Sequence, residues 1–267
     1  MFKLGMRAIY QKNIEAAILE AKRLGFKVLE IHLSAPQFLI AQYSAKRILA
    51  IKKIAEKEGI ILQTHAPAEF SLIFVDENLR QGARKQLKEM IKFSQALGAR
   101  ALTLHPGKAA IFHQVDGEKI KDDDLYSKFY CRLFEDSIKD IISIAPKNLF
   151  ICIENTDNFN LGYQKILDKY LRAGKIFLTW DIRKNFDFTT NKLIKEQWNF
   201  VVKNQRAVKN LHVSGLGAGH GKIDGWEKQL KPFFKLFRNC NLPLIIEVLP
   251  KKETVKAKNI IEKIYEK

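Results

Sequence analysis

Apolar and polar positions follow a repeating order along the chain, in which a short apolar or β-branched run precedes a longer amphipathic stretch. Runs of this length are typical of buried strands, and the longer stretches have the spacing of helices. The amphipathic patterns "NIEAAILEAKRLG" and "LRQGARKQLKEMIKFSQALG" close at Gly25 and Gly98, where a helix end favours a residue that tolerates positive φ. The expected strands lie at residues 2–8, 27–33, 60–65, 100–105, 149–154, 176–181, 208–213 and 243–248.

Eight repeats of strand and helix predict an α/β protein with a closed (β/α)8 TIM barrel. No Ser/Gly-rich linker and no shift in composition divides the chain, so we expect a single domain over residues 1–267. A doubly wound open sheet is the alternative, but it predicts a GxGxxG turn after an early strand, and that pattern is absent there. The glycine-rich stretch at residues 215–221 follows the seventh strand, and we expect it to form a loop.

Composition adds limits to this picture. With 267 residues and 46% hydrophobic residues, the chain has enough apolar surface for one large core. It contains no uncharged apolar run of about 18 residues, and its first residues lack a signal-peptide pattern, so we expect a cytoplasmic protein without a membrane partner. Cys131, Cys152 and Cys240 are odd in number and far apart, which predicts reduced thiols.

The net charge of +17 favours anionic partners. Most of the excess is lysine spread over expected helix faces such as "KRILAIKKIAEKEG", whereas dedicated nucleic-acid surfaces cluster Arg and Lys with aromatic residues. We therefore expect weak, non-specific nucleic-acid association that falls with salt.

The strongest chemical signal lies at the C-terminal ends of the expected strands, where the active site of a TIM barrel is built. Helix capping favours Ser, Thr, Asp and Asn, and so does not explain four imidazoles at one rim. Imidazole and carboxylate together are the ligands of Zn, Mn or Fe, which predicts a shared metal site at the barrel mouth. The residues at these strand ends are Glu30, His32, His65, His105, Glu154, Asp181, His212 and Glu247.

The order of "THAP", "LHPG", "IEN", "WD", "LHVS" and "IIEV" on successive strands resembles the xylose-isomerase-like TIM barrel superfamily, which includes sugar phosphate isomerases and epimerases and endonuclease IV. The epimerase branch implies one divalent metal, Zn or Mn, held by the residues of strands five to eight, namely Glu154, Asp181, His212 and Glu247. By the same resemblance, Glu154 and Glu247 also serve as catalytic acid and base. The endonuclease IV branch implies that His65 and His105 join Glu154 around a second ion.

The chain also departs from these relatives. Endonuclease IV holds a third metal with a His three residues after the strand-six Asp and with a D-x-H after strand seven. Here Lys184 takes the first position, and "GLGAGHGKIDG" contains no D-x-H. Ala68 stands where that family has a Tyr, and sugar isomerases often use the His replaced by Lys184 as a substrate contact.

Four further residues are candidates for substrate binding. Lys184 is expected to bind a phosphate or sugar oxygen, or else to pair with Asp187. His220 lies in the glycine-rich loop, where it either swings over the mouth or remains solvated. Glu30 and His32 share one face of their strand and either face substrate, support the metal ligands, or form a buried hydrogen bond.

These observations favour a divalent-metal-dependent isomerase or epimerase of a small-molecule sugar or sugar phosphate. Such an enzyme transfers a proton next to a carbonyl through a metal-stabilised enediolate. The alternative is an endonuclease IV-like phosphodiesterase that acts on abasic DNA with two metals roughly 3.5–4 Å apart. A barrel that binds a ligand without turnover is the third hypothesis.

Overall fold

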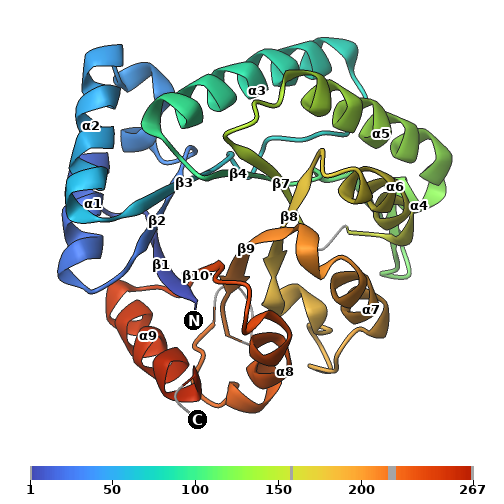
Figure 1. Ribbon diagram of the computed structural model, residues 1–267. Coiled ribbons are helices and arrows are strands. Elements are labelled where there is room, and N and C mark those ends of the chain that lie inside the picture. Colours follow the sequence, from blue (N-terminus) through green and yellow to red (C-terminus); the bar gives the residue numbers. More distant parts are fainter. Residues whose placement is uncertain (1, 157–158, 216–220, 266–267) are drawn as a thin grey trace.

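Eight parallel strands close into a barrel, which confirms the predicted TIM barrel fold (Figure 1). The computed structural model describes residues 2–156, 159–215 and 221–265. Around the barrel the strands follow the order β1, β10, β9, β8, β7, β4, β3, β2, so the first and last strands of the chain are neighbours. Their bounds are β1 Lys3–Ala8, β2 Val28–His32, β3 Ile61–His65, β4 Ala101–Leu104, β7 Phe150–Glu154, β8 Phe177–Asp181, β9 Val208–Val213 and β10 Pro243–Ile246.

The helices form a ring outside the barrel (Figure 1), and the longer ones bury apolar residues in the core that surrounds the strands. The ends of α3 show how local sequence sets these bounds: the side chain of Asp76 accepts a hydrogen bond from the backbone N of Leu79, and Gly98 ends the helix at φ 71°. The bounds are α1 Ile14–Arg23, α2 Ala45–Glu58, α3 Glu77–Leu97, α4 Asp122–Leu125, α5 Ser127–Ile144, α6 Leu161–Arg172, α7 Lys195–Lys203, α8 Glu227–Phe237 and α9 Lys251–Tyr265.

One element was not predicted from the sequence. Strands β5 (Ile111–His113) and β6 (Lys119–Lys121) pair antiparallel in a separate two-stranded sheet between β4 and α4. Their side chains are exposed or only partly buried. The hairpin therefore adds nothing to the barrel core and lengthens the connection that follows His105.

The interior of the barrel contains a polar layer directly beneath the mouth. Glu30, Gln63 and Asn210 are all fully buried there. Thr103 and Thr179 face each other across the barrel with their hydroxyl oxygens 2.7 Å apart. A core layer of this composition costs free energy unless its polar groups are hydrogen-bonded, and contacts such as the one between Thr103 and Thr179 limit that cost.

The three cysteines are free, as the sequence predicted. Burial raises the pKa of the Cys152 thiol, on β7, to about 12. No helix in the described part of the chain has the length and apolar character needed to cross a membrane.

Candidate metal centre

Glu154 lies at the centre of the barrel mouth and contacts three imidazoles. Its Oε2 is 3.1 Å from Nε2 of His65 and 3.0 Å from Nε2 of His105. Its Oε1 is 3.2 Å from Nδ1 of His212. These residues come from the ends of β7, β3 and β9 and from the residue after β4, so the sheet closure itself brings them together.

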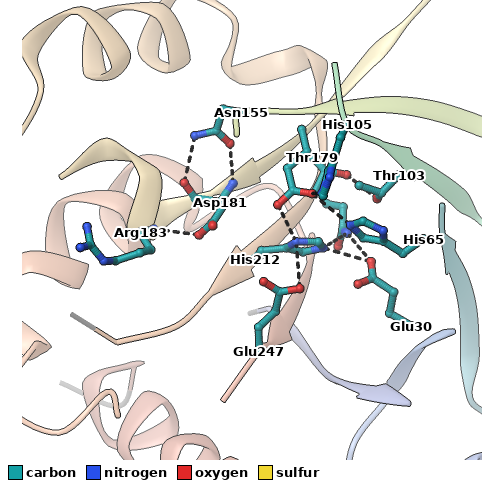
Figure 2. A network of polar contacts seen from close by, with 12 residues as sticks. Glu30, His65, Thr103, His105, Asn155, Thr179, Asp181, Arg183, His212 and Glu247 are labelled. Atoms are coloured by element: carbon teal, nitrogen blue, oxygen red, sulfur yellow. Dashed lines mark hydrogen bonds and ion pairs between the residues drawn. The ribbon is translucent and has the colours of Figure 1, made fainter. Parts of the chain in front are cut away.

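His212 lies between three carboxylates (Figure 2). Besides Glu154, its Nδ1 is 3.5 Å from Oε1 of Glu247, the residue that follows β10. On the other side of the ring, Nε2 is 3.0 Å from Oε2 of Glu30. His212 and Glu30 are fully buried, and Glu247 is only 5% exposed.

The charges of this cluster explain its pKa shifts. Burial opposes a charge on His212, but the carboxylates of Glu30, Glu247 and Glu154 outweigh it and hold the pKa of the imidazole well above its ordinary value. Burial also opposes the charge on Glu154, yet His212 and His105 hold its pKa well below the usual range. In the absence of a metal, a protonated His212 therefore balances the buried carboxylates.

The donor atoms have the chemistry and spacing that a divalent cation requires. Three sets of residues each offer ligand atoms that all lie within 4.8 Å of one another: Glu154 with His212 and Glu247, Glu154 with His65 and His105, and Glu30 with His65 and His212. Imidazole nitrogens and carboxylate oxygens are ligands for Zn or Mn. A cation bound to Glu154, His212 and Glu247 would replace the Nδ1 proton of His212 and balance the same carboxylates. The residues present therefore fit a divalent metal.

Asp181 stands apart from these three sets. Its Oδ1 accepts a hydrogen bond from the backbone N of Arg183 at 2.9 Å. The side-chain amide of Asn155 donates to the backbone O of Asp181 and accepts from its backbone N (Figure 2). Burial and the negative charges of Glu247 and Glu154 raise the pKa of Asp181 to about 8. The carboxyl is thus close enough to the other acids to feel their repulsion, which a bound cation would relieve.

These shifts predict how the stability of the metal-free protein depends on pH. Asp181, His65 and His212 all have raised pKa values in the folded state, so each contributes stability at low pH that is lost as pH rises toward its folded pKa. The benefit of the lowered Glu154 pKa is already complete above about pH 5 and does not change in this window. We expect the melting temperature in the presence of a chelator to fall between about pH 6 and pH 8.

The matched variant for this prediction is Asp181→Asn, which removes one of these titrations. It should raise the melting temperature at pH 8 more than at pH 6 and flatten the profile. A wild-type melting temperature that rises over the same interval would contradict the assignment of the shifts.

The other residues expected to contact substrate lie at different depths. Glu30 is fully buried below His212 and does not reach the surface of the mouth. His32 stacks on His65 with ring centroids 4.2 Å apart, and its Nδ1 is 3.0 Å from the hydroxyl of Ser34. Burial and the neighbouring His65 lower the pKa of His32, so its imidazole is neutral.

Two expected contacts belong to the loops around the mouth. Lys184 is half-buried close to Asp181, where its positive charge partly offsets the rise in the Asp181 pKa, and its Nζ is 4.8 Å from the centre of the Phe188 ring. His220 and residues 216–219 of the glycine-rich loop lie outside the described residues.

Arg7 is a charged residue of the mouth that the sequence analysis missed. It lies on β1 opposite Glu30 of β2, and its guanidinium is 3.6 Å from Oε1 of Glu247. The available signal was the single charge inside the apolar segment "LGMRA", at a position that alternates inward with Gly5. A prediction based only on acids and histidines at strand ends does not include it.

The chain is thus a TIM barrel whose strands carry, at their C-terminal ends, a buried histidine–carboxylate cluster that could hold a metal ion. The family model for xylose isomerase-like TIM barrels matches residues 18–220, and the chain belongs to this family. A search of curated proteins found no match to the sequence.

Solved structures with the same fold include both branches that the sequence resembles. A D-tagatose 3-epimerase-like protein superposes with a TM-score of 0.75 at 18% identity, covering 99% of this chain and 97% of that chain. D-psicose 3-epimerase from Clostridium cellulolyticum, solved with D-tagatose, gives 0.69 at 16% identity and covers 98% of both chains. Endonuclease IV from Thermus thermophilus gives 0.71 at 15% identity and covers 99% of both chains. At these identities the similarity shows the fold.

Proposed function

We propose that this protein is a divalent-metal-dependent isomerase or epimerase that acts on a sugar or a sugar phosphate. The observation that carries the proposal is the pair Glu154 and Glu247, two buried carboxylates on either side of the Nδ1 atom of His212. They come from β7 and from the end of β10, on different sides of the mouth. The solved sugar epimerases of the same fold support this choice.

In this proposal Glu154, Asp181, His212 and Glu247 would hold the metal, which would supply positive charge that stabilises the negative charge formed on the substrate. Glu154 and Glu247 move the proton next to the carbonyl, one from each face of the sugar. Arg7 orients Glu247 through their ion pair. Burial of the cluster keeps bulk water from the reacting carbon.

Lys184 is proposed to bind an anionic or hydroxyl group of the substrate. It is partly exposed beside Asp181, and its Nζ lies 4.8 Å from the centre of the Phe188 ring, so a ligand bound close to Asp181 would meet its positive charge. The net charge of +17 is consistent with a phosphorylated substrate. His220 and His32 are proposed as further substrate contacts.

A phosphodiesterase that acts on abasic DNA is the second candidate. The contacts of His65 and His105 with one oxygen of Glu154 favour it, because they provide donors for a second ion beside the first. Lys184 and Ala68 stand at positions where the resemblance to endonuclease IV implies a metal ligand and a tyrosine. We therefore rank this activity below sugar isomerisation.

Two assays on the same metal-loaded preparation distinguish these functions. An isomerase or epimerase should exchange a sugar C–H proton with deuterated solvent, which NMR detects on a panel of ketoses, aldoses and their phosphates. A nuclease should incise an abasic duplex at physiological salt. We expect exchange without incision, together with weak DNA association, with a Kd of about 10⁻⁴–10⁻⁶ M, that falls steeply with salt. Metal-dependent incision without exchange would reverse the ranking.

A further inference from the structure

Glu30 forms a buried contact with the imidazole that faces the proposed metal. Its Oε2 is 3.0 Å from Nε2 of His212 (Figure 2), whereas Glu154 and Glu247 contact the other ring nitrogen, Nδ1. Both side chains are fully buried, and they come from strands on different sides of the barrel, β2 and β9. The carboxylate therefore acts from below the mouth, where substrate does not reach it.

This contact sets the tautomer of His212. An ionised carboxylate only accepts hydrogen bonds, so Nε2 must carry the hydrogen that is donated to Glu30. As a metal ligand His212 would be neutral and carry one hydrogen, which leaves Nδ1 with its lone pair directed at the space between Glu154 and Glu247. That lone pair is what a metal ligand needs.

Asn210 contacts both members of the pair formed by Glu30 and His212. Its side-chain Nδ2 donates to Oε2 of Glu30 at 3.2 Å and is also 3.0 Å from Nε2 of His212. If Nδ2 donated to the imidazole instead, the hydrogen would move to Nδ1 and block the ligand atom. A hydrogen bond to a charged carboxylate is about twice as strong as one between neutral groups, which favours the first arrangement.

We propose that Glu30 is a positioning residue that orients His212 and fixes its tautomer for metal binding. The inference rests on the proposed metal site and adds a role for a residue that touches neither substrate nor metal. It also gives a reason for placing a carboxylate in the barrel interior, where a buried charge is costly without a partner. Asn210 supports Glu30 in the same layer.

The test compares the zinc affinity of the full-length wild type and of Glu30→Gln by competition with a chromophoric chelator. The glutamine amide has nearly the same shape but can donate to Nε2 of His212, which favours the blocked tautomer. We expect the variant to bind zinc about 10–100-fold more weakly with an unchanged number of ions per chain. The matched control is Thr103→Val, which removes the buried contact with Thr179 in the barrel interior and should leave zinc affinity unchanged.

A second measurement does not depend on the folding of any variant. In the zinc-loaded wild type, ¹⁵N NMR of the imidazole of His212 should show a protonated Nε2. A protonated Nδ1, or a Glu30→Gln variant with wild-type zinc affinity, would overturn the role of Glu30 while leaving the metal site intact. A variant that holds one zinc fewer than the wild type would make Glu30 a ligand. A wild type that binds no zinc or manganese would instead remove the metal site itself.

Discussion

Glu154→Gln should lower the rate of solvent proton exchange into the sugar by at least about 10³-fold, the largest effect expected of a single substitution in this protein. Both carboxylate oxygens of Glu154 are engaged, one by His65 and His105 and the other by His212. The amide keeps the shape of the side chain but loses its charge, its basicity and half of its acceptor atoms. Metal binding and proton transfer should therefore fail together. Exchange is measured by NMR in deuterated solvent.

The control for this prediction is Asp123→Asn, which neutralises another carboxyl that is only 2% exposed but lies on α4, where it accepts a hydrogen bond from Asn160 and belongs to none of the three ligand sets. Exchange in this variant should stay close to that of the wild type. If both variants lose exchange equally, the loss reflects general damage to the fold. If Glu154→Gln retains wild-type exchange, Glu154 is neither the proton-transfer group nor an essential ligand.

His212→Gln should produce the largest loss of stability in the metal-free protein, about 3–5 kcal/mol in the free energy of unfolding. The substitution removes the positive charge that lies between Glu30, Glu154 and Glu247 and leaves their buried carboxylates facing one another. For a chain of this size each kcal/mol lowers the melting temperature by about 2–4 °C. Thermal unfolding in the presence of a chelator at about pH 6 measures the effect, since His212 is protonated there.

His32→Gln is the matched comparison, because His32 is also a buried imidazole but its pKa is lowered and its hydrogen bond goes to the hydroxyl of Ser34. Its replacement leaves no carboxylate without a counter-charge, so the expected loss is only about 1 kcal/mol. Equal losses in the two variants would mean that packing, and not the charge of His212, determines the stability of the cluster.

The barrel could be predicted from the sequence because its signal is local. Each strand is a short apolar run, and glycines such as Gly98 mark helix ends, so element order and fold class follow from spacing alone. The hairpin formed by β5 and β6 escaped prediction because each strand has three residues and neither buries an apolar face. Such a hairpin leaves no periodic pattern to detect.

That the candidate ligands meet at the barrel mouth could be predicted for a different reason. In a parallel barrel all strand C-termini lie at one end, so residues at those termini must be neighbours whatever the details of packing. From this rule alone, His65, His105 and His212 are expected near Glu154, and in the structure they contact it.

The depth of each side chain could not be predicted in this way. Whether Glu30 faces substrate or supports His212 depends on the stagger between β2 and β9, strands that are far apart in the sequence and in the barrel order. Arg7 was missed because its role depends on its neighbours, Glu247 and Glu30, which only the closure of β1 against β10 and β2 reveals.

The most direct test of the central claim is the metal content of the purified chain, measured by inductively coupled plasma mass spectrometry after expression without added chelator. The cluster around Glu154, His212 and Glu247 predicts one or two divalent ions per chain, zinc or manganese, with near-complete loss in His212→Gln. A wild-type chain that contains no divalent metal and takes up neither ion on titration would contradict the account.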